Sequence, residues 1–177
     1  YEGPTDPTIT GSFGNILTYK NLKLNVFVTY SFGNVIRLDP VFSNAYSDLD
    51  AMPKEFKNRW MKAGDENVTN IPTIVSTRMN QQYAYLNMAY NAYNYSDVRI
   101  ADGGFIRLKE ISLSYDLPAK VINFFRLNKL QLKLQATNLC LLYADSKLNG
   151  QDPEFFRSGG VSTPVPKQFT FTVRLGL

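Results

Sequence analysis

Several stretches of the chain alternate between apolar and polar residues, and this two-residue period is typical of a β-strand with one apolar face. The clearest is 167–177, where one face carries Phe169, Phe171, Val173, Leu175 and Leu177. A second run, 129–141, places on one face Leu130, Leu132, Leu134 and Ala136. A third, 21–33, places on one face Leu22, Leu24, Val26, Val28, Tyr30 and Phe32. The residues between them are polar, apart from Phe27, so each run predicts a strand with one apolar and one polar face.

Two further runs are less regular. In 105–115, Ile106 and Leu108 share one phase, whereas Ile111 and later apolar residues share the other. A β-bulge near Lys109–Glu110 would bring both sets to the same face, because it inserts one unpaired residue. The run 9–19 is the weakest, since it contains two glycines. We therefore predict five strands, near 9–19, 21–33, 105–115, 129–141 and 167–177.

The connections between these strands alternate strictly between short and long. The segment "YKN" makes a tight turn, and Pro118 ends the third strand before a helical turn at 119–126. By contrast, 34–104 and 142–166 are long loops. Short turns at one end and long loops at the other are typical of an outer-membrane β-barrel, in which the long loops are extracellular. Eleven residues rise about 36 Å, which a tilt of about 40° reduces to roughly 28 Å, enough to cross an apolar band of about 25 Å.

Five strands cannot close a membrane barrel, because about eight is the smallest number that does so. An open sheet in lipid would also leave the backbone groups of both edges without partners. The pattern therefore leaves two alternatives. Either the chain is an antiparallel part of a larger transmembrane β-barrel, or it is a soluble or surface-attached β-sandwich that binds glycan or protein.

The amino-acid composition excludes several kinds of reaction and binding site. The 177 residues contain no His and one Cys, Cys140, which excludes a disulfide within the chain, His-based metal sites and Ser-His or Cys-His catalysis. We expect Cys140 to be a buried or lipid-facing small hydrophobe, and the protein not to be an enzyme and to need no cofactor. The net charge of +4 is scattered, so no nucleic-acid partner is expected. The first ten residues resemble no signal peptide, and no apolar run is long enough for a transmembrane helix.

Six segments, in order, resemble the C-terminal part of the SusC/RagA family of TonB-dependent outer-membrane transporters. They are "FGNILTYKNLKLNVFVTYSFGN", "RWMKAGDENVTNIP", "GGFIRLKEISLSYDLPAK", "LNKLQLKLQATNLCLL", "GQDPEF" and "PVPKQFTFTVRLGL". The similarity covers nearly the whole chain. Two departures are the final Leu177, where the family usually has Phe, and "NLCLL", where the family has Trp or Tyr after "NL".

The resemblance implies the last five strands of a barrel of about 22 strands, with the plug domain absent from this sequence. It implies a multi-pass protein of the Gram-negative cell outer membrane that imports oligosaccharides or peptides. The implied partners are a SusD-like surface lipoprotein, the rest of the barrel and its plug, outer-membrane lipid and the TonB-ExbB-ExbD energy-transducing system, which acts through the missing N-terminal part. The apolar faces then point to lipid, the polar faces to the lumen, and Leu177 lies at the periplasmic rim.

Basic residues on the polar faces are the first candidate site. Arg107, Lys133 and Arg174 fall at lumen-facing positions, where they would pair with acidic plug residues or steer anionic substrates. The alternative is that a water-filled lumen tolerates any polar residue.

Aromatic residues of the long loop are the second candidate. Tyr83, Tyr85, Tyr90, Tyr93 and Tyr95 offer flat rings with a hydroxyl at the edge, which suits stacking on sugars or gripping a peptide. The alternative is packing within the loop or at a membrane interface. In "MPKEFKNRWMKAGD" we predict a short helix with Pro53 in its first turn and Gly64 past its end, which places Phe56 and Trp60 on one face, for core packing or for contact with a partner.

Two acidic residues of "GQDPEF", Asp152 and Glu154, have the residue types of a glycosidase pair. Such a pair must flank a cleft, whereas these carboxylates lie two residues apart in a proline turn. We therefore expect them to form and cap the turn.

Overall fold

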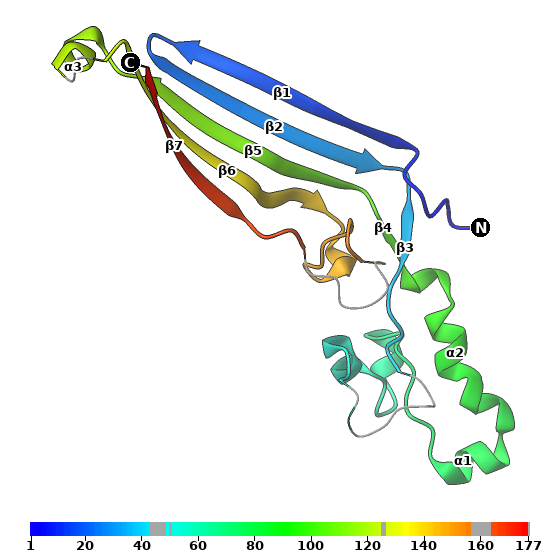
Figure 1. Ribbon diagram of the computed structural model, residues 1–177. Helices are drawn as coiled ribbons and strands as arrows, with labels where there is room; N and C mark the ends of the chain where they lie inside the picture. The colour runs from blue at the N-terminus through cyan, green and yellow to red at the C-terminus, as the bar shows by residue number, and fades with distance from the viewer. Residues whose placement is uncertain (43–48, 50, 125–126, 157–163, 177) are drawn as a thin grey trace. The chain divides into compact units, whose positions relative to one another are not determined.

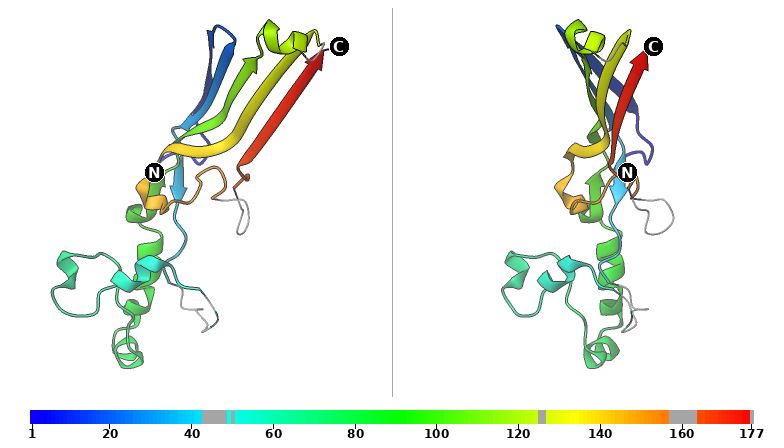
Figure 2. Two further views of the ribbon diagram at one scale, coloured as in Figure 1. Left: turned by 90° about the vertical axis from the view of Figure 1, so that its left-hand side faces the viewer. Right: turned by 60° about the vertical axis from the view of Figure 1, so that its left-hand side comes forward.

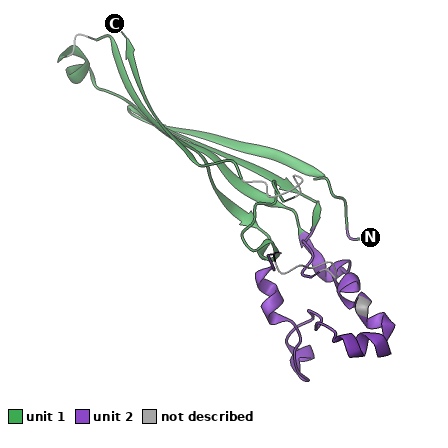
Figure 3. Cartoon of the chain, turned by 60° about the horizontal axis from the view of Figure 1, so that its bottom comes forward, with its two compact units in different colours: residues 1, 3–36, 102–177 green, residues 2, 37–101 purple. Residues whose placement is uncertain are grey.

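The computed structural model describes residues 1–42, 49, 51–124, 127–156 and 164–176. The chain divides into two compact units, which Figure 3 shows in different colours. Unit 1 comprises residues 1, 3–36 and 102–177, and unit 2 comprises residues 2 and 37–101. None of the described helices is both long and apolar enough to span a membrane.

Unit 1 is built on one antiparallel sheet whose five long strands follow each other in the order β1-β2-β5-β6-β7. The strands are β1 (Ile9–Tyr19), β2 (Leu22–Phe32), β5 (Phe105–Asp116), β6 (Lys129–Ala144) and β7 (Gln168–Gly176). They lie side by side in Figure 1, and the two views of Figure 2 show the sheet twisted, with β1 and β7 at its edges. Twist of this kind follows from the chirality of the residues.

The alternating runs coincide with these strands. β1 begins and ends at the predicted residues, β5 ends one residue later than predicted, and β6 continues three residues further, to Ala144. β2 is one residue shorter than predicted at each end, and β7 begins one residue later, while residue 177 lies outside the described residues. The bulge in β5 is confirmed, because Val28 pairs with Leu108 while Phe27 pairs with Glu110, which leaves Lys109 without a partner in β2. Two register shifts between β5 and β6 accompany the extension of β6.

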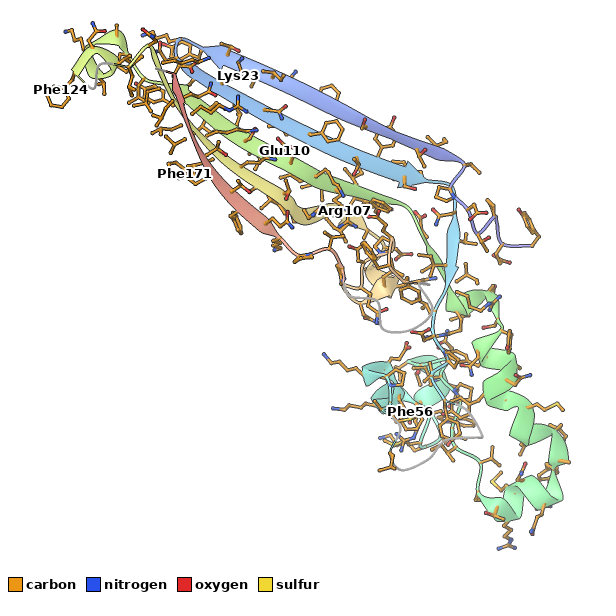
Figure 4. All side chains as sticks on the ribbon, in the orientation of Figure 1. Lys23, Phe56, Arg107, Glu110, Phe124 and Phe171 are labelled. Atoms are coloured by element: carbon orange, nitrogen blue, oxygen red, sulfur yellow. The ribbon has the colours of Figure 1, made fainter. Side chains whose placement is uncertain are left out.

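The short connections are as tight as the sequence predicts. Lys20 adopts a positive φ of 50° in the turn between β1 and β2, and the side-chain amide of Asn21 donates to the Asp116 carbonyl at 2.8 Å. After Pro118, α3 (Ala119–Phe124) provides the predicted helical turn, and residues 125–126 lie outside the described residues. The side chain of Phe124, labelled in Figure 4, is exposed on this helix.

Unit 2 consists of short helices around a small apolar core. Its elements are η1 (Lys54–Asn58), η2 (Asp65–Asn67), α1 (Thr77–Gln82), η3 (Ala84–Met88), α2 (Ala89–Asn94) and η4 (Asp97–Arg99). Val41, Ile71 and Tyr90 form the buried centre, and the partly buried rings packed against it are Phe42, Phe56 and Tyr93. Two short strands, β3 (Val35–Arg37) and β4 (Ile100–Asp102), form a separate two-stranded sheet.

The predicted helix, with Pro53 in its first turn and Gly64 past its end, is wrong in its length. Only η1 forms, because Arg59 has an extended backbone and the Trp60 N–H donates to the Ile71 carbonyl at 3.0 Å instead of continuing the helix. Phe56 therefore joins the core, while Trp60 lies beyond the helix and stays 40% exposed.

The turn after Trp60 is stabilised by the side chain of an aspartate. Gly64 takes a φ of 100°, which favours glycine, just before η2. The backbone N–H groups of Met61 and Lys62 donate to the Asp65 carboxylate at 3.0 and 3.1 Å. These bonds hold the pKa of Asp65 below its ordinary value.

Candidate functional site: the polar face of the sheet

The register places most apolar residues of the five long strands on one face, because directly opposite residues of an antiparallel pair point to the same side. One continuous apolar row contains Leu17, Leu24, Leu113, Leu134 and Phe171. A parallel row contains Tyr19, Leu22, Tyr115, Leu132 and Val173. Phe171 is labelled on β7 in Figure 4. These rows form the apolar face of the sheet.

The opposite face is polar over the same strands. One row contains Thr18, Lys23, Ser114, Lys133 and Thr172, and the next contains Ile16, Asn25, Ser112, Gln135 and Thr170. Arg174 pairs with Gln131 on this face, and Arg107 pairs with Thr29. Lys23, Glu110 and Arg107 of this polar face are labelled in Figure 4. The structure therefore places the three predicted basic residues on one face, as the alternation requires.

Burial in the sheet is the inverse of that in a water-soluble sheet. The buried residues of the five long strands are all polar: Ser31, Arg107 and Ser112. Large apolar side chains are exposed instead, among them Leu134 at 58% and Phe169 at 77%. Since folding in water buries apolar surface, a sheet of this kind is suited to an apolar environment on its apolar face.

Arg107 is the centre of a buried ion cluster on the polar face. Its Nη2 atom lies 2.6 and 2.7 Å from the two carboxylate oxygens of Asp152 and 3.1 Å from Oε2 of Glu154. The side chains of Arg107 and Asp152 are 6% and 7% exposed, whereas that of Glu154 is 45% exposed. The ring of Phe105 lies 5.3 Å from the guanidinium carbon.

A hollow of about 760 Å³ lies within unit 1 beside this cluster. Its polar lining consists mainly of hydroxyl, amide and charged side chains: Thr5, Asp6, Thr10, Thr29, Ser31, Asn34, Lys109 and Glu154. Pro153 and Phe105 also line it. The Oδ1 atom of Asn34 is buried, and no hydrogen-bond partner is recorded for it within the described residues. The hollow can therefore accept a ligand or protein segment rich in hydrogen-bonding groups.

The turn predicted for "GQDPEF" is present. The Glu154 N–H donates to Oδ1 of Asp152 at 3.1 Å, as expected of a turn-forming aspartate. The sequence did not indicate the ion pair of Asp152 with Arg107, because the two residues are 45 positions apart and neither lies in a spacing motif. The residues around an arginine in an alternating strand do not show which distant carboxylate will pair with it.

The tyrosines of unit 2 fall into two groups. Tyr83 and Tyr85 are 42% and 70% exposed, with ring centroids 6.1 Å apart. Tyr90 is buried and its hydroxyl donates to the Pro72 carbonyl, while Tyr93 packs against the same core. Burial raises the pKa of Tyr90 above its ordinary value. Packing therefore accounts for Tyr90 and Tyr93, and Tyr83, Tyr85 and Trp60 remain available at the surface of the unit.

Unit 2 also has a buried arginine that the sequence did not single out. Nη1 of Arg99 lies 2.9 Å from Oε2 of Glu55, Nη2 donates to the Asp39 carbonyl, and the guanidinium lies 5.6 Å from the Tyr93 ring. Burial alone lowers the pKa of Arg99, but the hydrogen bond and charge of Glu55 outweigh it, so that the pKa lies above its ordinary value.

Metal-binding clusters are absent from the part of the chain that the structure describes. No group of three or more Cys, Asp or Glu residues is arranged there to hold a metal. Cys140 pairs with Leu108 and is exposed on the apolar face. This placement is consistent with the lipid-facing alternative for the thiol.

The comparisons with known proteins point to one class. No protein-family model matches the chain. The chain is 27% identical over 152 residues to TonB-dependent receptor P3 of Formosa agariphila, covering 86% of this chain and 13% of the receptor. It is 26% identical over 192 residues to TonB-dependent receptor P26 of the same organism, covering 97% and 17%. The chain therefore spans less than a fifth of the length of either relative.

Solved structures share the fold. The RagAB peptide importer in its "open-open" state matches 98% of the chain and 17% of the importer chain, with a TM-score of 0.67 and 22% identity. The RagAB peptide transporter matches 97% and 17%, with a TM-score of 0.66 and 23% identity. The fold is that of part of a TonB-dependent receptor barrel, seen here as an open antiparallel sheet. The chain is therefore similar in sequence to TonB-dependent receptors and in fold to the RagAB importer.

Proposed function

We propose that the chain forms part of the wall of an outer-membrane nutrient importer that depends on TonB. In this proposal the apolar face contacts lipid and the polar face lines the passage. The inverted burial of the sheet carries the proposal, because the long strands bury only polar residues and expose their apolar ones. The relatives and the fold neighbours are receptors and importers by name, which is consistent with a role in transport rather than catalysis.

The dimensions of the apolar face support a membrane location. Tyr19 and Tyr115 lie in its row nearest the short turns, and Tyr30 and Tyr143 lie in the row with Gly11 and Ile106 near the other end. On β2, these rows are eight residues apart, from Leu22 to Tyr30. Eight residues span about 27 Å along a strand, and a tilt of about 40° leaves about 21 Å of height. This height is comparable with the apolar band of about 25 Å, which aromatic girdles border in barrels of this kind.

The edges of the sheet indicate further partners. β1 and β7 each pair with one neighbour only, and an unpaired edge is unfavourable in lipid. The rest of a barrel, with a plug inside it, would satisfy both edges. The described strands form one five-stranded and one two-stranded sheet, so a β-sandwich of two extended sheets has no support.

Unit 2 is the part that we propose to contact a SusD-like surface lipoprotein outside the membrane. It has an internal core and exposes Trp60, Tyr83 and Tyr85. Exposed aromatic residues of this kind are enriched at protein interfaces. TonB and its ExbB-ExbD partners would supply the energy for transport, and the substrate class would be peptides or oligosaccharides.

Uptake by cells tests the proposal. Cells that express the native protein should accumulate labelled peptides or oligosaccharides, and deletion of the protein or of TonB should abolish this uptake to the same extent. A cell in which the protein is deleted and complemented serves as the control. Uptake that persists without TonB, or a protein that fractionates away from the outer membrane, would contradict the proposal.

A further inference from the structure

The hollow on the polar face has one wall that belongs to the loop after β6. Pro153 and Glu154 line the hollow, and both follow directly from the aspartate that pairs with Arg107. The position of this wall therefore depends on how the segment Asp145–Phe156 is held against the sheet.

The segment is fixed at both ends. At its start, the Asp145 carboxylate accepts from the Asp102 N–H at 2.8 Å and from the Lys147 N–H at 2.9 Å. Leu148 of η5 (Ser146–Leu148) is 1% exposed. Towards its end, the Asp152 carboxylate meets Arg107. Arg107 comes from the rigid strand β5, so it ties this loop to the sheet.

Arg107 is poorly accessible to a ligand, and its Nε atom is buried with no hydrogen-bond partner recorded among the described residues. Its side chain is 6% exposed, and Nη2 already faces three carboxylate oxygens. Two carboxylates against one guanidinium leave the cluster with a net charge of −1. The exposed member is Glu154, whose carboxylate lines the hollow. A cation buried in this way does not attract anions from the passage, because its field is neutralised locally.

We propose that Arg107 is a positioning residue, and that its ion pair with Asp152 fixes the Pro153–Glu154 wall of the hollow. Arg107 does not contact the substrate, and Glu154 presents the charge on this wall. The proposal rests on the proposed function in one respect, namely that the polar face lines the passage. It replaces the expectation that Arg107 steers anionic substrates with a role in shaping the wall.

Amide hydrogen exchange in the native transporter, purified in detergent, tests the proposal. Arg107→Met should speed exchange at the Glu154 and Phe155 amides, which donate to the side chain and the carbonyl of Asp152. We expect an increase of at least about tenfold, because breaking a buried ion pair costs more than the 1.4 kcal/mol that corresponds to a factor of ten. Arg107→Lys, which keeps the charge, should restore part of the protection.

Lys133→Met is the matched control. Lys133 lies on the same face, and no ion pair is recorded for it among the described residues. Its replacement should leave exchange at Glu154 and Phe155 unchanged. If Arg107→Met fails to assemble, Asp152→Asn decides the question, since it keeps the arginine and should give the same local increase. Unchanged exchange in an assembled Arg107→Met or Asp152→Asn protein would overturn the proposal.

A second measurement separates a positioning role from substrate contact. If Arg107 contacted the substrate, Arg107→Met would raise the KM for uptake while exchange in 145–156 stayed the same, and this outcome would also overturn the proposal. The exchange result does not depend on transport. A protein with the predicted exchange but no TonB-dependent uptake would therefore contradict the proposed function and leave the role of Arg107 intact.

Discussion

The two units of the chain use apolar residues in opposite ways. Unit 2 has a closed apolar cluster, with Val41 fully buried and the rings of Phe42, Phe56 and Tyr90 in contact around it, although other apolar side chains of the unit are exposed. In the sheet of unit 1, the large apolar side chains are on the surface and the buried residues are polar. Unit 2 is thus organised for water on its outside, whereas the sheet is organised for an apolar phase on one face and water on the other.

The difference shows that one chain can contain two parts whose apolar residues are arranged for different surroundings. Among the described residues, each unit nevertheless buries one arginine. Arg99 of unit 2 pairs with one carboxylate and Arg107 of unit 1 pairs with two. In both units this ion pair joins segments that are distant in the sequence. The pattern of apolar residues determines which environment suits each unit. In each unit, a buried ion pair fixes the position of a loop.

The largest expected effect comes from the core of unit 2. Ile71→Ala should lower the free energy of unfolding of this unit by about 2–5 kcal/mol, because it leaves a cavity in a closed core. Limited proteolysis of residues 51–101 in the native protein measures the effect. Ile74→Ala is the control, since Ile74 is exposed in the same unit. Equal proteolysis of the two variants would show that unit 2 has no closed core.

A charge on the apolar face should have the next largest effect. Leu134→Arg should destabilise the barrel by about 1–3 kcal/mol, because its row lies between the midplane, where an arginine on a lipid face costs about 2–4 kcal/mol, and the interface, where the cost falls to about 0–1 kcal/mol. Folding into lipid vesicles, followed by the shift in gel mobility on heating, measures it. Gln135→Arg is the matched control, because this neighbour lies on the polar face. If both variants folded equally well, the two faces would not differ in environment.

The sequence predicts the structure of unit 1 better than that of unit 2, and the comparison of the two units explains why. Alternation with period two predicts all five long strands and the bulge at Lys109, because strands exposed on both faces to different solvents must alternate. It also places Lys133 and Arg174 on the polar face. Unit 2 has no such period. Its predicted helix, which was to end before Gly64, is replaced by the shorter η1, because the Trp60 N–H has a partner in Ile71 that is eleven residues away.

The candidate site was predicted only in part, for a physical reason. The residue types that line a passage, such as Arg107, can be predicted from strand phase. The carboxylate that neutralises Arg107 cannot be predicted in this way, because it comes from a loop, and strand phase says nothing about the conformation of a loop. Likewise, spacing does not distinguish the buried Tyr90 from the exposed Tyr85, since both lie in one tyrosine-rich segment.

A smaller effect is expected from a single hydroxyl in the core of unit 2. Tyr90→Phe removes the hydrogen bond to the Pro72 carbonyl and should cost about 0.5–1.5 kcal/mol. The same proteolysis of residues 51–101 measures it. Tyr95→Phe, at a ring that is 71% exposed, should change the rate much less. A larger loss for Tyr95→Phe would contradict the arrangement of the core.

The smallest effect on stability is expected at the surface of unit 2. Tyr85→Ala should change the free energy of unfolding by no more than about 0.5 kcal/mol, because the ring is 70% exposed. It should nevertheless reduce the amount of partner lipoprotein that copurifies with the transporter, since aromatic residues dominate interface energies. Val68→Ala is the control at another exposed position. Unchanged copurification would remove Tyr85 from the proposed interface.

The most direct test of the central claim is a scan of residues 130–137 with spin labels in the native transporter reconstituted in lipid. Each position is replaced in turn by cysteine, in a background in which Cys140 is changed to Ala. Collisions with oxygen, which concentrates in lipid, and with a water-soluble nickel complex are then measured. We predict a period of two, with oxygen favoured at Leu130, Leu132, Leu134 and Ala136 and nickel favoured at the residues between them. Equal access at neighbouring positions, or nickel favoured at the apolar ones, would contradict the assignment of the apolar face to lipid.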